Sequence, residues 1–328
     1  MKLKAIYDLF VSEGMKKDPR GMEMVQAQLT REKRSYEKMS DKEKADYDLE
    51  RLTNPYADTR ILYGDLDTDV KSLIVGVDLE GTELLLADRL REKGKRIDLA
   101  MSHHPEGAAA TNLYDVMHLQ ADMMVKMGVP RHTAEGILDE RILEVRRRFL
   151  PTNIFRPVDV ARLLEIPYMC CHTVADNHVT TFLQKKFDDE KPQNLHDVID
   201  LLKATPEYSD ATLYGTGLLV LSRAIASEAK LSKIPCGNVF VDMTGGTGGS
   251  IKAFEKLSQT TQIDTIVGMH IGEEHLKFAR ENHMNVVVAG HMASDTLGIN
   301  LLLDELEKKE KIEVISCSGF RRYSRVKK

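Results

Sequence analysis

Three short polar motifs contain the side chains with the clearest potential for chemistry. The motifs are SHHP, CHTVADN and AGHMASD, and each follows an apolar run that predicts a buried strand. Neutral imidazole and carboxylate are common ligands of divalent zinc, iron and manganese. A single histidine is more often a surface or core residue, but three such motifs at equivalent positions favour a metal site. The residues concerned are His103, His104, His172, Asp176, His291 and Asp295.

The last motif places His291 and Asp295 four residues apart at the expected start of a helix. At this spacing the two side chains lie on one helix face, about 5–6 Å apart at Cβ, which suits one cation. The partial positive charge of a helix N-terminus disfavours imidazolium and so keeps His291 available as a ligand. On this motif alone, it is equally consistent that His291 caps the helix and Asp295 is a first-turn carboxylate.

The adjacent histidines of the first motif carry the more specific signal. Successive side chains of an extended segment point to opposite sides, so His103 and His104 are poorly placed to chelate one ion together. Pro105 holds His104 in an extended conformation. The pair therefore suits two metals, or one ligand beside one base. The alternative is that only one of the two histidines is functional.

The middle motif offers a carboxylate that could bridge two ions. Asp176 follows a predicted strand and is the best bridging candidate, since hydrolytic two-metal sites hold their ions close together. His172 is expected to orient a ligand or to contact substrate, and His178 is the weaker candidate.

The elements that position these motifs follow an α/β pattern. Leu73–Val77 is an apolar β-branched run, Thr82–Glu92 is an amphipathic helix, and the run before His103 supplies the next strand of a βαβ unit. The second half repeats strand, loop and helix and ends in the strand KIEVISCSGF. We expect two α/β lobes, 1–185 and 186–328, with helical insertions near 15–52 and 112–149, the first as a peripheral hairpin. Ligands of such sheets gather at the carboxyl ends of the strands.

Composition narrows the class of protein. The 328-residue chain has a net charge of −5, which argues against a protein that grips nucleic acid by charge. Its four cysteines form no CxxC pair, so neither a zinc knuckle nor a disulfide framework is implied. No signal peptide or membrane-spanning run is recognisable, and we expect a cytoplasmic protein without a membrane partner.

The order and spacing of the three motifs, together with a glycine-rich turn, resemble the NIF-three-like family, whose members are often described as GTP cyclohydrolase I type 2 homologs. The resemblance runs from about Tyr56 to Ile299. It implies a two-lobed fold with a dinuclear metal site in the cleft and a ring-shaped homo-oligomer, commonly a hexamer. The metal ligands that it implies are His103, His104, Asp176, His291 and Asp295. The family usually has glutamate where this chain has Asp295, and its insertion between the first two motifs is shorter.

Two further features are candidates for the site. The turn DMTGGTGGS lies between a strand and a helix, where backbone N–H groups bind anions. It does not match a dinucleotide-binding loop because Ile251 occupies the last glycine position. Gly245, Gly246 and Gly248 are therefore either a phosphate cradle or a tight turn. One of Glu273, Glu274 and His275 is a candidate acid–base residue, with Glu274 preferred, although solvated surface residues are the alternative; His172 is the other candidate.

These observations predict a hydrolase that uses two divalent metal ions (Zn, Fe or Mn) and acts on a nucleotide-like or phosphate-bearing small molecule. The first alternative is a non-catalytic protein that stores, delivers or senses metal through the same ligands. The second is a nucleotide-binding structural module in which the histidines are incidental.

Overall fold

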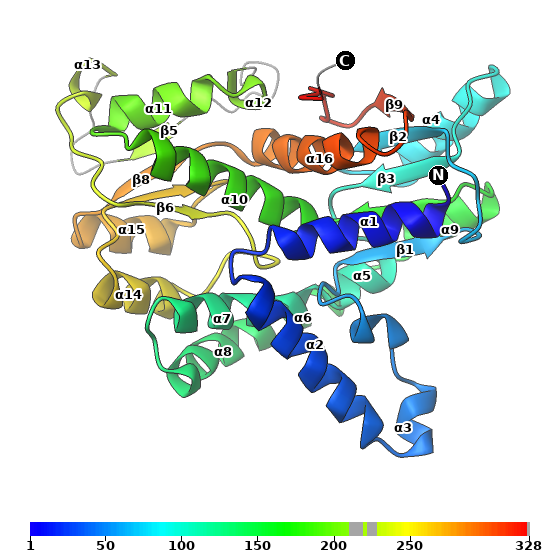
Figure 1. Cartoon of the computed structure of the whole chain (residues 1–328), viewed down its shortest axis with the longest axis horizontal. Coiled ribbons are helices and arrows are strands. Elements are labelled where there is room, and N and C mark those ends of the chain that lie inside the picture. The colour runs from blue at the N-terminus through cyan, green and yellow to red at the C-terminus, as the bar shows by residue number, and fades with distance from the viewer. Residues whose placement is uncertain (210–218, 222–227, 327–328) are drawn as a thin grey trace.

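The computed structural model describes residues 1–209, 219–221 and 228–326, and in these residues the strands form two sheets (Figure 1). The first sheet has the order β1-β4-β3-β2-β9, and the second has the order β5-β8-β7-β6. The predicted α/β fold with two lobes is confirmed. The strands of the first sheet are β1 (Thr59–Tyr63), β2 (Ser72–Gly76), β3 (Leu99–Ser102), β4 (Tyr168–Cys171) and β9 (Glu313–Ser316). Those of the second are β5 (Leu219–Leu221), β6 (Val239–Asp242), β7 (Thr265–Gly268) and β8 (Asn285–Val288).

The first sheet is buried on both faces, which explains the unbroken apolar run of β2. Every residue of β2, β3 and β4 is buried, and these three strands are parallel. Helices α1 (Leu3–Lys16), α10 (Thr173–Glu190) and α16 (His291–Glu307) cover one face, and α4 (Gly81–Glu92) and α9 (Arg156–Leu163) cover the other. Strand β1 is antiparallel to β4, so its first residues lie at the same edge as the carboxyl ends of the parallel strands.

The closing strand of the chain joins the first sheet rather than the second. Strand β9 pairs in parallel with β2, from Ser72 opposite Glu313 to Val75 opposite Ser316. This pairing covers an edge of β2 that would otherwise expose its backbone hydrogen-bonding groups. The C-terminal segment of the chain therefore returns to the N-terminal lobe, although the sequence pattern had placed this strand with the second half.

The second sheet has three parallel strands, β6, β7 and β8, with β5 antiparallel at its edge. Helices α14 (Ile251–Thr260) and α15 (Glu273–Glu281) pack on one face. The other face is covered by α10, α16 and the amphipathic α11 (Leu195–Lys203), whose buried residues recur at helical spacing. Short helices α12 (Pro206–Ser209) and α13 (Glu228–Leu231) lie beside α11 (Figure 1).

Two helices belong to both hydrophobic cores. The first residues of α10, including Val174 and Ala175, pack in the first core, whereas Val179 and Leu183 pack in the second. Helix α16 does the reverse, with Leu297 in the second core and Leu302 in the first. The segments of α10 and α16 that carry Asp176 and Asp295 therefore lie at the junction of the two lobes.

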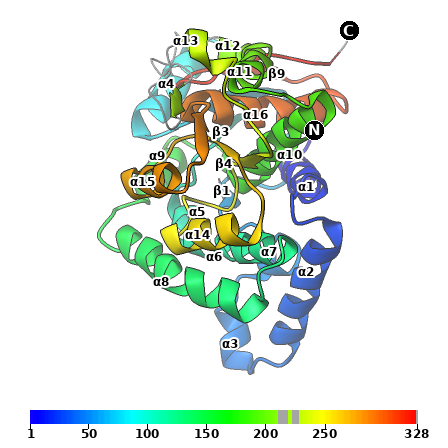
Figure 2. The same cartoon turned by 90° about the vertical axis from the view of Figure 1, so that its left-hand side faces the viewer.

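The remaining helices are peripheral. Helices α2 (Met22–Glu37) and α3 (Asp41–Ala45), followed by the 3₁₀ turn Leu49–Leu52, extend beyond the rest of the molecule in both views (Figures 1 and 2), as expected for the charged segment. The long insertion folds as α5 (Gly107–Thr111), α6 (Leu113–Val116), α7 (His118–Lys126) and α8 (Arg131–Phe149). In the part of the chain that the structure describes, the helices are too short or too polar to cross a membrane.

Candidate metal centre

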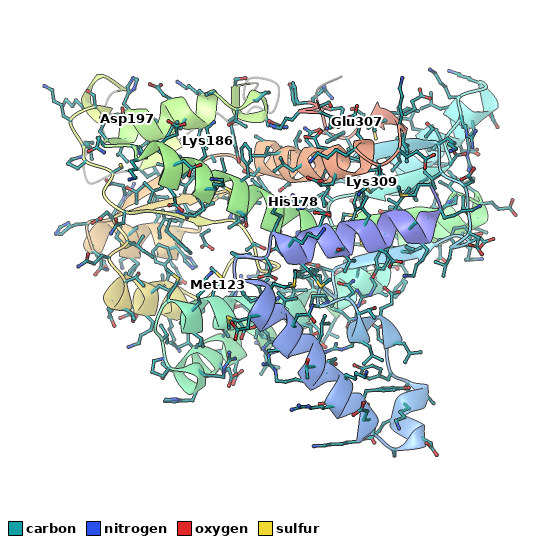
Figure 3. The ribbon with its side chains drawn as sticks, viewed as in Figure 1. Met123, His178, Lys186, Asp197, Glu307 and Lys309 are labelled. Atoms are coloured by element: carbon teal, nitrogen blue, oxygen red, sulfur yellow. The ribbon has the colours of Figure 1, made fainter. Side chains whose placement is uncertain are left out.

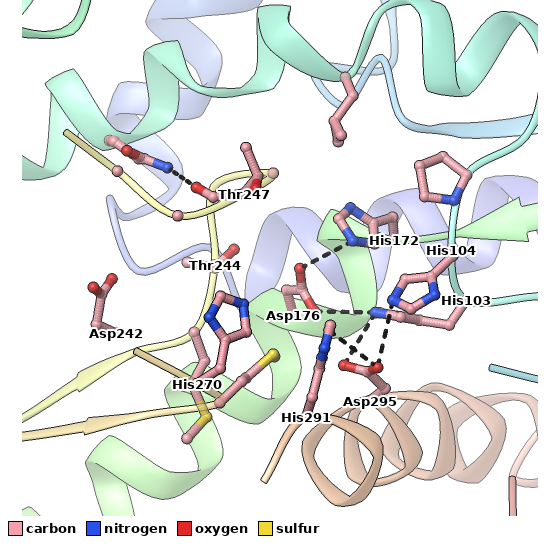
Figure 4. Close-up of a pocket in the computed structure, with 18 of the residues that line it drawn as sticks. His103, His104, His172, Asp176, Asp242, Thr244, Thr247, His270, His291 and Asp295 are labelled. Carbon is pink, nitrogen blue, oxygen red and sulfur yellow. Dashed lines mark hydrogen bonds and ion pairs between the residues drawn. The ribbon is translucent and has the colours of Figure 1, made fainter. Parts of the chain in front are cut away.

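The carboxyl ends of the parallel strands in both sheets border one pocket of about 360 Å³ (Figure 4). The first sheet contributes His103 and His104 after β3 and His172 after β4. The second sheet contributes Asp242 at the end of β6 and His270 after β7. The pocket lies where the sequence places a ligand site, and all the predicted metal ligands line it, namely His103, His104, Asp176, His291 and Asp295.

His103 is held with one ring nitrogen directed into a cluster of carboxylates. Its Nδ1 lies 3.1 Å from the carbonyl oxygen of Cys171, and because a carbonyl only accepts, Nδ1 carries the proton. Its Nε2 therefore presents a lone pair, 3.4 Å from Asp176 Oδ1 and 3.4 Å from Asp295 Oδ1. The side chain is 1% exposed, so these carboxylates are its polar surroundings.

His104 and His172 are oriented in the same way by carboxylates. His104 Nδ1 lies 2.6 Å from Asp78 Oδ1, and His172 Nδ1 lies 2.8 Å from Asp58 Oδ2. Asp58 also accepts a hydrogen bond of 2.6 Å from the Thr173 hydroxyl, which fixes its position. In both histidines Nε2 faces the cluster, 3.6 Å from Asp295 Oδ2 for His104 and 3.9 Å from Asp176 Oδ2 for His172. A carboxylate behind a histidine is a frequent feature of metal sites.

Asp295 lies at the centre of the cluster. It is fully buried, and neither of its carboxylate oxygens has a hydrogen-bond partner among the described residues. His291 Nε2, one helical turn earlier, lies 3.5 Å from Asp295 Oδ2, as the spacing predicts. Helix α16 begins at His291 directly after Gly290, whose φ of 106° allows the sharp turn from β8. The Oδ1 atom of Asp176 is likewise buried without a hydrogen-bond partner in the described part of the chain.

The electrostatics of the cluster indicate a shortage of positive charge. Burial raises the pKa of Asp176 to about 7, and burial together with the charge of Asp176 raises that of Asp295 well above its usual value. Burial by itself lowers the pKa of His172, but the nearby Asp176 and Asp58 raise it to about 9. Burial and the neighbouring histidines lower the pKa of His103. Buried carboxylates without hydrogen bonds are costly unless a cation compensates them.

The residues present fit a metal ion. The ligand atoms form three groups, each within 4.8 Å: His103, Asp176 and Asp295; His104, His291 and Asp295; and His103, His104 and His172. Adjacent ligand atoms on a tetrahedral zinc ion lie roughly 3.3–3.4 Å apart. The nitrogen–oxygen distances of 3.4–3.6 Å around Asp295 are close to this span and too long for good hydrogen bonds. Although aspartate has a shorter side chain than glutamate, Asp295 thus reaches His103, His104 and His291.

Two details differ from the sequence-based expectation. The adjacent His103 and His104 do converge, since their ligand atoms share one group with His172, because the segment after β3 turns there instead of staying extended. The carboxylate common to two groups is Asp295, whereas the sequence favoured Asp176 as the bridge. Asp295 gains this position because α16 starts just after β8, so that its first two turns, which carry His291 and Asp295, lie beside the histidines that follow β3.

The glycine loop borders the same pocket, whereas Glu274 does not. Gly246 and Gly248 line the pocket, and Gly245 accepts a hydrogen bond from Gln120 at its carbonyl oxygen. Glu274 is exposed at the start of α15 and is not among the lining residues. The structure therefore does not bring Glu274 to the cluster.

Asp58, Asp78 and Gln120 were not identified from the sequence. Asp78 lies two residues after the end of β2, a position that would have marked it as a candidate. Asp58 precedes β1, and only the antiparallel direction of this strand brings it to the same edge. Gln120 belongs to the insertion, and its side chain donates hydrogen bonds to the carbonyls of Gly245 and Thr247, at 2.8 and 2.6 Å. No local sequence pattern predicts such a long-range contact.

Comparison with known proteins supports the fold. No protein-family model matches the sequence, and no curated protein matches it. Among solved structures, a NIF3 superfamily protein from Sphaerobacter thermophilus is 28% identical with a TM-score of 0.65, over 80% of this chain and 92% of that chain. Reduced HcgD from Methanocaldococcus jannaschii (16% identity, TM-score 0.47, 78% and 87%) and TTHA1606 from Thermus thermophilus (15%, 0.45, 79% and 86%) are more distant. The family resemblance is therefore confirmed.

Proposed function

We propose, on the premise that this chain has the fold of the NIF3 superfamily, that it is a cytoplasmic metal-dependent hydrolase of phosphate-bearing or nucleotide-like small molecules. The observation that carries the proposal is the buried carboxylate of Asp295, which has no hydrogen-bond partner among the described residues and faces the Nε2 atoms of three histidines. A purely structural cluster would pair such a carboxylate with a donor.

The two groups that share Asp295 would hold two divalent ions of zinc, iron or manganese. His103 and Asp176 complete one group, and His104 and His291 complete the other. When bound, such ions lower the pKa of water and polarise a phosphoryl oxygen. The protein fixes the tautomers of two of its ligands. His103 Nδ1 donates to the Cys171 carbonyl and His104 Nδ1 donates to the Asp78 carboxylate, which leaves both Nε2 atoms available to a metal ion.

His172 is the residue that we assign to proton transfer. Asp58 holds its Nδ1, and its Nε2 faces the pocket beside Asp176. Asp176 and Asp58 favour the protonated imidazole of His172, and an imidazole that faces the pocket can pass a proton to a leaving group. Glu274 has no part in this assignment because it is not among the residues that line the pocket.

The glycine loop supports a substrate with a phosphate group. Gly246, Gly248 and Gly249 line the pocket on the side of the second sheet, opposite the cluster. Backbone N–H groups before a helix favour anions. Gln120 from α7 and Arg141 from α8 bind carbonyl oxygens of this loop, so the insertion holds the loop in place.

The proposal is tested by loading the purified protein with Mn²⁺, Zn²⁺ or Fe²⁺ and measuring turnover of 4-nitrophenyl phosphate, bis(4-nitrophenyl) phosphate and nucleoside phosphates. We expect turnover that His103→Ala abolishes and chelation removes. Metal bound without turnover across this panel would instead support metal storage, delivery or regulation. Metal content unchanged in His103→Ala and Asp176→Ala would remove the site itself.

We also propose a homo-oligomer, following the family resemblance. Light scattering should then give a mass that is a multiple of the 37.0 kDa chain, with 37.0 kDa itself contradicting the proposal.

A further inference from the structure

A second cavity of about 140 Å³ lies beside the candidate metal centre, between α7, α14 and the second sheet. We call it the side pocket and define it by its apolar lining residues Met123, Met124, Met127, Phe254, Ile266 and Val286. Met123 comes from α7, in the helical layer beside the second sheet (Figure 3). Nothing in the proposed function so far uses this cavity.

The side pocket adjoins the metal pocket. The two cavities share six lining residues, Gln120, Asp242, Thr244, Gly248, Gly249 and His270. Figure 4 shows Asp242, Thr244 and His270 on the side of the pocket opposite His103 and Asp295. Polar side chains and glycines therefore lie at the boundary between the two cavities, while the methionines and Phe254 line only the side pocket of the two. One molecule can place a polar group at the cluster and an apolar group in the side pocket.

Size and lining indicate what the apolar group is. A cavity of about 150 Å³ lined by apolar side chains holds one benzene molecule, and the side pocket is 140 Å³. Its wall is aromatic, because Phe254 meets His275 edge to face with ring centroids 5.6 Å apart. Three methionines complete the wall, and thioethers pack favourably against aromatic rings. A single ring matches this volume and lining.

Thr180 of α10 also lines the side pocket. The residue is 4% exposed, and its hydroxyl is buried without a hydrogen-bond partner among the described residues. The hydroxyl itself is not accessible from the cavity, so the apolar side chains remain the main contact surface for a ligand.

We propose that the substrate carries one aromatic or similarly compact apolar ring, which binds in the side pocket while the reacting phosphate group lies at the metal cluster. The insertion 112–149 thereby sets specificity, since α7 supplies Gln120 and two of the methionines, and Met127 follows it directly. This inference rests on the proposed function, because it identifies the part of the same substrate that does not react.

The ring site is tested without activity by NMR of protein labelled with ¹³C at the methionine methyl groups. Titration with benzyl alcohol should shift the resonances of Met123, Met124 and Met127, through ring currents, and leave that of Met1 unchanged, because Met1 binds the Val70 carbonyl at the amino ends of the parallel strands of the first sheet. Ethanol at equal concentration should shift none of them. Absence of benzyl alcohol shifts at the three methionines would overturn the proposal.

Two variants change the side pocket in opposite ways. Ala253→Leu adds bulk at a lining position, and Phe254→Ala removes the aromatic wall. Each should weaken benzyl alcohol binding by at least tenfold. Phe278→Ala is the matched control, because Phe278 packs on Phe254 at 5.6 Å but does not line the cavity. Unchanged affinity in both Ala253→Leu and Phe254→Ala would contradict the proposal, and the signal of Met1, which packs against the first core, checks that each variant is folded.

A second comparison separates this inference from the proposed function. With metal-loaded protein, benzyl phosphate should be hydrolysed with a kcat/KM at least tenfold above that of ethyl phosphate. Equal values would contradict the ring site and leave the hydrolase intact. Benzyl alcohol shifts without turnover of either ester would support the ring site and contradict the hydrolase.

Discussion

The histidines of the cluster depend on residues that do not touch the pocket centre. Asp58 and Asp78 determine which ring nitrogen of His172 and His104 carries a proton, and the carbonyl of Cys171 does the same for His103. A sequence scan finds the ligands because histidine and aspartate are conspicuous after strands. It does not find their partners, whose roles depend on strand direction.

Replacing Asp58 by asparagine tests this arrangement. An amide keeps the shape but loses the charge that orients and protonates His172, so we expect turnover to fall about 10- to 100-fold with little loss of metal. Asp98→Asn is the control, since Asp98 accepts backbone hydrogen bonds at the opposite edge of the same sheet. Steady-state kinetics and metal analysis check both variants. Equal kcat in wild type and Asp58→Asn would argue against a role of His172 in proton transfer.

Asp176 gives the metal-free protein a predictable pH dependence. Its pKa in the folded state, about 7, lies above the ordinary value of 3.8, so the protonated form favours folding. This contribution is complete below about pH 4 and is lost as pH rises towards 7. Asp176→Asn lacks the titration, so in chelator its stability relative to wild type should increase between pH 4.5 and 7.5. Denaturant unfolding at both pH values measures this, and a free energy of unfolding of Asp176→Asn that stays constant or falls relative to wild type as pH rises would refute it.

At the scale of elements, the site depends on the close approach of α10 and α16. A Cβ atom at Gly298 of α16 would lie 2.6 Å from the carbonyl oxygen of Ala175, next to Asp176. Only glycine lets the two helices meet there and bring Asp176 and Asp295 to the same histidines.

Gly298→Ala should therefore separate the helices. We expect a loss of about 1–3 kcal/mol in the free energy of unfolding from overpacking, together with weaker metal binding. Gly136→Ala is the matched control, because no atom lies within 4 Å of a Cβ added there on α8. It should stabilise the protein by up to about 1 kcal/mol. Unfolding curves and metal titrations distinguish the two, and equal stability of both variants would contradict the packing argument.

The helices and strands themselves are easier to predict from the sequence than the way in which they pair and pack. The strand β2 and the helix α4 were predicted within one residue, because buried strands and amphipathic helices have local signatures. The pairing of β9 with β2 and the antiparallel direction of β1 were not, since pairing depends on contacts far apart in sequence. The insertion was expected to be helical, but its contact with the glycine loop depends on tertiary packing.

At the scale of the molecule, metal should stabilise the fold. The candidate ligands come from both halves of the chain, with His103 in the first and Asp295 in the second, and they join the two cores at α10 and α16. Free metal at 1,000 times its Kd stabilises a protein by about 4 kcal/mol. Chelation should thus lower the melting temperature of wild type by several degrees and that of Asp295→Asn hardly at all. Calorimetry with and without chelator provides the comparison, and equal shifts in both proteins would be the contrary result.

The number of metal ions bound per chain tests whether the protein has a dinuclear metal centre. Elemental analysis of protein loaded with Mn²⁺, Zn²⁺ or Fe²⁺ and dialysed should give two ions for wild type and for Asp98→Asn. Asp295→Asn, which keeps the shape of the carboxylate that faces three histidines, should bind fewer than one. Wild-type protein that retains no metal, or Asp295→Asn that retains two ions, would contradict a dinuclear metal centre that depends on Asp295.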